Sequence, residues 1–149
     1  MSNRKFNFDK NFKSEFDKYI RETEDKLLAV VKMSIQDVVE EAQTPVAKGG
    51  KMRVDTGFLR ASGVADINKL PVGPKEGEKR KAGQTGVIYE WDMSSSLQDK
   101  LVKLNLGDTL YFGWSARYAL YRELYDGFLK SACDNWSSYV SKNIKEITK

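Results

Sequence analysis

The residues of this chain best suited to chemistry are four carboxylates, on Glu90, Asp92, Glu123 and Asp126. Paired carboxylates can act as the acid and base of a glycosidase or bind a magnesium ion. An enzyme built on them would be a nuclease or a cell-wall hydrolase, but their spacing favours neither chemistry. The same segments also contain Arg117 and Arg122, so salt bridges at a subunit boundary are the favoured interpretation.

Two of the commonest catalytic side chains offer little here. The chain has no histidine, which removes the most frequent general base and the most frequent metal ligand together. Its one cysteine, Cys133, lies one position from the apolar stripe of the last predicted helix. Without a histidine to activate it, we expect a buried or half-buried structural thiol. The sequence therefore predicts no catalytic residue, no metal site and no cofactor.

A glycine-containing segment, 73–86, has a superficial likeness to a phosphate-binding loop. However, Gly77 is followed by Glu78, and the chain contains no Gly-Lys-Ser/Thr triplet. Nucleotide binding is therefore not expected. The segment is interpreted as part of a long exposed loop or hairpin extension over residues 68–86.

The basic excess of the chain is concentrated in its middle. The net charge is +4, and residues 48–90 carry nine basic against five acidic side chains. The main basic cluster consists of Lys69, Lys75, Lys79, Arg80 and Lys81. Glu76 and Glu78 interrupt it, and no recognition helix or aromatic RNA-binding strand accompanies it, so base-specific reading is not expected. Non-specific contact with DNA phosphates, or with an acidic face of another protein, remains open.

Length and composition suit a single domain. A chain of 149 residues with 40% apolar content can bury one modest core, so residues 1–149 are treated as one unit. With one cysteine and no apolar run after Met1, neither a disulfide nor a secretion signal is expected. No stretch approaches the roughly 20 apolar residues that span a bilayer. We expect a soluble protein that is made in a cytoplasm and does not contact membranes.

The first element that must position these residues is a long amphipathic helix. No glycine or proline precedes Pro45, which predicts a helix over residues 10–43, roughly 50 Å long. Its apolar residues recur in steps of three and four, at Phe12, Phe16, Tyr19, Leu27, Val30, Val38 and Ala42. A core of this size cannot cover the whole stripe. Part of the helix is therefore expected to pack on a neighbouring subunit.

Shorter elements should follow Pro45. Residues 48–51 predict a flexible turn, and a short helical turn capped by Asp55 or Thr56 should be pinned to the core by Phe58 and Leu59. Strands are predicted at 63–67, 87–91 and 109–114, with a short helix through Leu97, Leu101 and Leu104 that is capped from 94–96 and ends before a turn at 107–108.

The chain should close with helices. A helical segment at 116–124 is ended by Gly127, and one amphipathic helix of about five turns then runs through Phe128, Ala132, Trp136, Tyr139, Val140, Ile144 and Ile147. The predicted fold class is therefore α+β. It combines a long N-terminal helix, a small antiparallel sheet with an extended loop or hairpin, and a C-terminal amphipathic helix.

Two segments, in this order, resemble the neck and tail-completion proteins of tailed bacteriophages, often called minor tail or head-tail joining components. The first is Pro45 with residues 54–62 (Val-Asp-Thr-Gly-Phe-Leu-Arg-Ala-Ser), similar to that family's Pro-Val-Asp-Thr-Gly-x-Leu-Arg-x-Ser. The second is 106–112 (Leu-Gly-Asp-Thr-Leu-Tyr-Phe), followed by Tyr-Ala and a Glu. The residues that carry the resemblance are Asp55, Thr56, Gly57, Leu59, Arg60, Ser62, Gly107, Asp108, Tyr118, Ala119, Arg122 and Glu123.

The chain departs from the family pattern in two places. Residues 46–53 separate Pro45 from the Val-Asp-Thr-Gly run, which is usually contiguous with it, and this insertion should lengthen a surface loop. After Glu123 the family commonly has Tyr-Gly and a loop with prolines, whereas residues 124–127 lead directly into helix here. The shape of this edge, and the partner it meets, therefore differ from the family pattern.

The resemblance implies a non-catalytic virion protein at the head-tail connector, made in the host bacterial cytoplasm. It implies a ring, with six subunits expected, that contacts other neck, adaptor and tail proteins. In that role Thr56, Gly57 and Arg60 would shape a tight turn with an outward guanidinium. Tyr118, Arg122 and Glu123 would tie the last helical region to the sheet or to a neighbour. The alternatives are a tail terminator and a small basic protein that binds DNA phosphates through the 68–86 loop.

Overall fold

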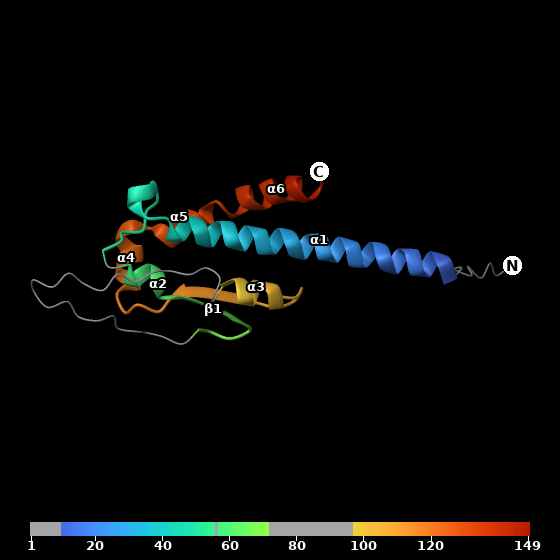
Figure 1. The fold of residues 1–149 in the computed structure, drawn as a ribbon, viewed down its shortest axis with the longest axis horizontal. Coiled ribbons are helices and arrows are strands. Elements are labelled where there is room, and N and C mark those ends of the chain that lie inside the picture. The colour runs from blue at the N-terminus through green and yellow to red at the C-terminus, as the bar shows by residue number, and fades with distance from the viewer. Residues whose placement is uncertain (1–9, 56, 72–96) are drawn as a thin grey trace, which may run out of the picture.

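The computed structural model of the chain describes residues 10–55, 57–71 and 97–149. Its spine is α1, Lys10–Gln43, a single helix that runs through most of the length of the molecule (Figure 1). It is followed by η1 (Val46–Lys48), α2 (Phe58–Ala61), β1 (Gly63–Ile67), α3 (Asp99–Lys103), β2 (Leu110–Trp114), α4 (Ala119–Asp126), α5 (Phe128–Asp134) and α6 (Trp136–Ile147). The predicted α+β class, with a long first helix and a helical C-terminus, is confirmed.

The bounds of α1 follow from its composition. Its 34 residues include no glycine or proline, and a residue directly before a proline disfavours helical geometry. The chain accordingly leaves the helix at Thr44, one residue ahead of Pro45. The amide and the hydroxyl of Thr44 donate to the carbonyls of Glu41 and Glu40, at 3.1 and 2.7 Å, and close the last turn. The predicted range of 10–43 is therefore confirmed.

Within the described residues, β1 and β2 form a two-stranded antiparallel sheet. Gly63 lies opposite Trp114 and Ile67 lies opposite Leu110. The first strand has the predicted bounds, and the second begins one residue later than predicted. The strand expected at 87–91 and the capping serines expected at 94–96 lie outside the described residues.

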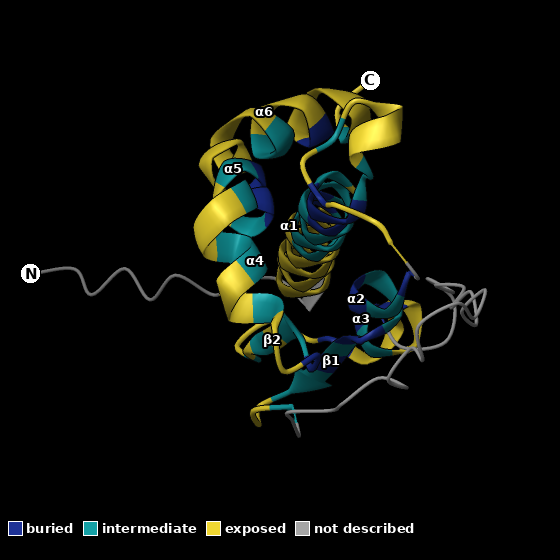
Figure 2. Cartoon of the chain, turned by 90° about the vertical axis from the view of Figure 1, so that its left-hand side faces the viewer, coloured by how far each residue is buried: buried dark blue, intermediate teal, exposed yellow. Residues whose placement is uncertain are grey.

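Viewed along its axis, α1 lies between two groups of elements. The helices α4, α5 and α6 curve around one side of α1, and the sheet lies with α2 and α3 on the other (Figure 2). One buried cluster joins the end of α1 to α5 and consists of Ala42, Met52, Leu59, Ala116, Phe128 and Ala132. The other joins α1 to the sheet and α3 and consists of Val39, Ala65, Leu97, Leu101 and Leu104.

The C-terminal region differs from the single helix that was predicted. Helix α5 ends at Asp134 and α6 begins at Trp136, because Asn135 between them adopts φ −90° and ψ 4°, outside the helical range. The Asn135 side chain donates to Glu41 Oε1 at 2.8 Å. This break directs α5 toward the end of α1 and α6 along its middle. The apolar spacing continued through Asn135 and carried no sign of the break.

Candidate interaction surfaces

The first family-like segment forms a buried corner. Gly57 has φ 82°, a conformation that favours glycine, and it takes the N-cap position of α2 where Asp55 or Thr56 was predicted. Leu59 and Ser62 are buried. The Ser62 hydroxyl donates to the Leu59 carbonyl at 2.7 Å. Gly57, Leu59 and Ser62 are thus held inside the fold, whereas Val54 and Asp55 are exposed and Thr56 lies outside the described residues.

Arg60 is less exposed than the sequence suggested. The residue is half-buried, and its Nε atom is enclosed. Its carbonyl accepts a hydrogen bond from the Gln43 side chain at 3.2 Å, which links α2 to the end of α1. The outward guanidinium stays a prediction, because the enclosure of Nε does not establish where the two terminal nitrogens lie.

The second family-like segment begins with a turn that side-chain hydrogen bonds hold in place. Gly107 has φ 92°, as a tight turn there requires. Asp108 accepts hydrogen bonds from the Asn105 amide and from the Asn68 side chain, both at 3.0 Å. Asn68 in turn accepts from the Thr109 amide at 2.8 Å. The Asn68 hydrogen bond, together with the Asn105 amide, lowers the pKa of the Asp108 carboxyl. The turn predicted at 107–108 is confirmed, and Asn68 is the partner that sequence analysis missed.

In α4 the predicted charged residues act within the chain. Arg122 makes a bidentate contact with Asp126, from Nε at 2.9 Å and from Nη2 at 2.7 Å. Asp126 is nearly buried, and Arg53 Nε lies 3.6 Å from its Oδ1 atom. The expected salt bridge is confirmed for Arg122 and Asp126. Its location at a subunit boundary stays a prediction, and Glu90 and Asp92 lie outside the described residues.

Glu123 has a different role from an ion pair. Its two carboxylate oxygens accept hydrogen bonds from the amides of Leu129 and Lys130, at 2.8 and 2.9 Å. These amides belong to the first turn of α5 and have no partner within their own helix. Gly127, with φ 63°, turns the chain between the two helices so that Glu123 can reach them. Glu123 therefore fixes α4 to α5. At the start of α4, Tyr118 lies 6.3 Å from the Phe58 ring, and Ala119 is half-buried against the α1–α5 cluster.

Cys133 is not the buried thiol that the sequence suggested. It is exposed on α5, because the adjacent Ala132 takes the core position on this turn. Partial desolvation, followed by the carboxylates of Glu123, Asp134 and Glu41, raises the pKa of the thiol. A raised pKa keeps the sulfur protonated and lowers its nucleophilic fraction at neutral pH.

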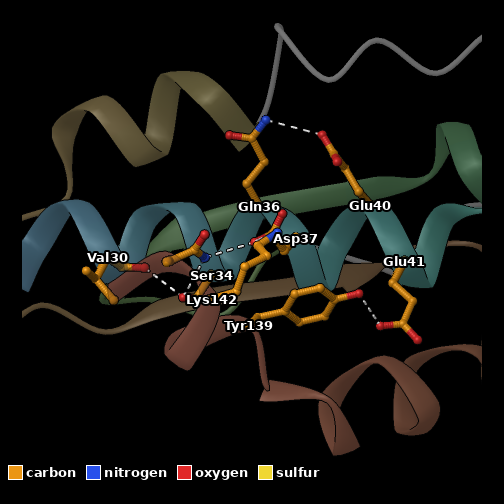
Figure 3. A network of polar contacts seen from close by, with 9 residues as sticks. Val30, Ser34, Gln36, Asp37, Glu40, Glu41, Tyr139 and Lys142 are labelled. Carbon is orange, nitrogen blue, oxygen red and sulfur yellow. Dashed lines mark hydrogen bonds and ion pairs between the residues drawn. The ribbon is translucent and has the colours of Figure 1, made fainter. Parts of the chain in front are cut away.

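A polar seam joins α1 to α6 (Figure 3). Asn143 is almost fully buried and donates to Ser34 Oγ at 3.1 Å and to Asp37 Oδ2 at 2.9 Å. Lys142 forms an ion pair with Asp37 at 3.1 Å. Sequence analysis missed this seam because it followed only the apolar positions of each helix. The available signal was the polar residues that recur at helical spacing within the stripe that each helix turns toward the other.

Glu41 extends this polar contact between α1 and α6 toward the start of α6. Its Oε2 atom accepts a hydrogen bond from the Tyr139 hydroxyl at 2.6 Å. Desolvation, together with this contact, raises the pKa of Tyr139 to about 12. Tyr139 lies beside Glu41, while Asn143 lies beside Ser34 and Asp37, so α6 runs antiparallel to α1 and ends before it reaches the first half of that helix.

Two apolar surfaces stay exposed on the described part of the chain. The first, which we call the α1 surface, lies on the N-terminal half of α1 and consists of Phe12, Phe16, Tyr19, Ile20 and Leu27. The second, the α4 surface, consists of Leu120, Tyr121, Leu124 and Tyr125. Sequence analysis expected part of this helix to pack on a neighbouring subunit without saying which part, and in the structure the exposed part is the N-terminal half.

The other predicted contact residues cannot be placed. Lys75, Lys79, Arg80 and Lys81 lie outside the described residues, as does the glycine-containing segment 73–86. Among the residues that are described, no group of three or more acidic or thiol side chains could hold a metal ion. In the same part of the chain, no helix is both long enough and apolar enough to cross a membrane.

No family model, curated protein or solved structure matches this chain.

Proposed function

We propose that the protein is a non-catalytic, ring-forming subunit of the head-tail connector, or neck, of a tailed bacteriophage, where it joins or completes the tail. The proposal starts from the two segments that resemble the neck and tail-completion family, 54–62 and 106–123. Their order along the chain supports it, and so does their arrangement in the fold.

The observation that carries the proposal is that these two distant segments pack as one unit. The Ser62 carbonyl accepts hydrogen bonds from both the amide and the hydroxyl of Ser115, at 2.9 and 3.0 Å. Leu59 and Ala116 lie in the same buried cluster. Of the residues that carry the resemblance, Leu59, Ser62 and Ala119 pack at this corner, which supports a common fold for the two segments.

The contacts of the carboxylates support a structural role. Glu123 accepts from two backbone amides, and Asp126 is held by Arg122 and Arg53. Groups engaged in this way stabilise the fold and are poorly placed to exchange protons with a substrate. A ring subunit acts through its contacts, and the exposed apolar surfaces on α1 and α4 are suited to that.

Electron microscopy of phage that lack the gene tests the proposal. We expect separate filled heads and tails, with joined particles restored when the chain is supplied from a plasmid. Normal infectious particles without the gene would refute the proposed function. Tails of irregular length would instead assign the chain to the tail-terminator position, because a terminator stops growth of the tail tube.

A further inference from the structure

The α1 surface continues a helix face that is covered elsewhere. Steps of three and four residues carry the stripe from Phe16 and Tyr19 through Leu27 to Ser34 and Glu41, so all of them lie on one face of α1. From Ser34 to Glu41 this face is covered by α6. The C-terminus of α6 lies about midway along α1, and the N-terminal half extends beyond it (Figure 1).

The apolar residues of this uncovered half are 39–66% exposed, whereas Val30, Val39 and Ala42 in the covered half are 7% exposed or less. The same kind of amphipathic pattern is thus buried in one half and open in the other. A helix placed on the open half would extend the line of α6 along α1.

The α4 surface is open for a different reason. The contacts of Glu123 with α5 and of Asp126 with Arg53 hold α4 in place through its polar residues. The four apolar residues at positions 120, 121, 124 and 125 share the opposite side of the helix and are 65–84% exposed. Because α4 is fixed by these contacts, it presents a preformed apolar face of two leucines and two tyrosines.

The two surfaces lie at opposite ends of the molecule, with α4 at one end and the N-terminal half of α1 at the other (Figure 1). One copy cannot bring them together, but two consecutive copies can. We propose that copies of the chain meet head to tail, with the α1 surface of one packed against the α4 surface of the next. This inference rests on the ring proposed above and names the contact that builds it.

A head-to-tail contact between two copies fits better than a symmetric contact between like surfaces. Packing α1 on α1 would leave the α4 surface exposed, and packing α4 on α4 would leave the α1 surface exposed. One head-to-tail contact covers both. Repetition of a head-to-tail contact closes into a ring when the rotation between copies permits it.

The available area is sufficient for such a contact. A fully buried aromatic side chain removes about 150–250 Å² from solvent, so the nine residues together offer on the order of 1,000 Å². Specific interfaces bury about 1,200 Å² or more in total. The polar residues that flank both surfaces would supply the area that the nine apolar residues do not. Each surface contributes about half of this area, which is within the range of the largest apolar patch on a typical monomer, about 300–600 Å², and such patches are often functional.

Light scattering of the purified full chain tests the contact in solution. We expect the natural chain to self-associate as its concentration rises, and we expect Phe16→Glu and Leu124→Glu each to remain monomeric. Leu70→Glu is the matched control, because Leu70 and Leu124 are both leucines that are 74% exposed. Circular dichroism should show the same helix content in all variants, since each replaced side chain is largely open to solvent.

A mixture of the two variants distinguishes head-to-tail from symmetric contact. Each variant keeps one intact surface, so an equimolar mixture should form a dimer and nothing larger. A symmetric contact would instead leave one of the variants associated by itself, and the mixture would form no new species. That result would overturn the proposal.

Cross-linking inside assembled particles tests the same contact where the ring is proposed to form. In a Cys133→Ser background, a chain carrying both Phe16→Cys and Leu124→Cys should give a ladder of multimers with a short bis-maleimide. Chains carrying only one of these substitutions should give no ladder. Absence of the ladder, together with a chain that stays monomeric in solution, would overturn the contact.

Complementation separates this inference from the proposed function. If phage without the gene assemble normally, the proposed function is wrong, whatever the chain does in solution. If such phage fail to join heads to tails but are restored to normal by Phe16→Glu or Leu124→Glu chains, the function stands and the head-to-tail contact is wrong. Joint failure of both variants, with full rescue by Leu70→Glu, is the result expected.

Discussion

The two halves of α1 have the same amphipathic pattern and different surroundings. Residues 28–43 are covered by α5 and α6 on one side and by the sheet and α3 on the other, and they include Val39 and Ala42 of the two buried clusters. Residues 12–27 are exposed to solvent throughout. Helical periodicity therefore establishes that a face needs a partner, but it does not establish whether the partner lies in the same chain.

The strongest test of this comparison places a charge in each half. Ala42 is fully buried against Met52, Leu59 and Phe128, so Ala42→Asp leaves an unpaired carboxylate in the core. We expect it to lower the free energy of unfolding by about 3–5 kcal/mol. Leu27→Asp, in the open half, should change the free energy of unfolding by less than about 0.5 kcal/mol. Urea denaturation of both variants measures this, and equal losses would remove the distinction between the halves.

Alkaline titration examines the covered half through Tyr139. Its pKa lies at about 12, above the ordinary 10.0, because of desolvation and the Glu41 contact. Below pH 10 the phenol is protonated in both states, so it adds no pH dependence. Between about pH 10 and 12 only the unfolded chain releases the proton, and the free energy of unfolding should fall by up to about 1.4 kcal/mol per pH unit.

A near-ultraviolet absorbance titration measures the phenol directly. Tyr139 should titrate late, near pH 12, and Tyr139→Phe should abolish that late step. The same variant should flatten the alkaline fall in stability that is due to this residue. A late step that persists in Tyr139→Phe would assign it to another tyrosine and contradict the Glu41 contact.

Sequence reasoning succeeded where a local property decides the structure. The length of α1 follows from the absence of glycine and proline before Pro45. The turn at Gly107 follows from a residue type that tolerates positive φ. Each of these depends on residues within a few positions of one another.

It failed where a distant contact decides. The break at Asn135 is accompanied by a hydrogen bond to Glu41, which is 94 residues away, and Asn143 is buried only because Ser34 and Asp37 face it across the seam. Neither partner is visible in the local spacing. The prediction of a buried or half-buried Cys133 was wrong, because Ala132, which the predicted stripe already includes, takes the core position and the neighbouring Cys133 is exposed.

Two hydroxyls on α1 provide a matched comparison with a smaller expected effect on stability. Ser34 Oγ donates to the Val30 carbonyl at 2.7 Å, and Thr23 Oγ1 donates to the Tyr19 carbonyl at 2.8 Å. Ser34 alone of the two also accepts from Asn143 in the seam. We expect Ser34→Ala to lower the free energy of unfolding by about 1–2 kcal/mol, since a buried amide loses an acceptor. Thr23→Ala should leave it unchanged or raise it by a few tenths of a kcal/mol, because alanine favours helix.

The smallest expected effect concerns the position of the α4 surface. Glu123→Gln keeps the shape of the side chain and removes the charge that the first turn of α5 favours. We expect the free energy of unfolding to fall by about 0.5–1 kcal/mol and the amides of Leu129 and Lys130 to exchange hydrogen faster. Glu146→Gln, on the exposed end of α6, is the matched control and should change neither quantity. Unchanged exchange at both amides would mean that Glu123 does not hold the first turn of α5, and that the direction in which the α4 surface faces does not depend on it.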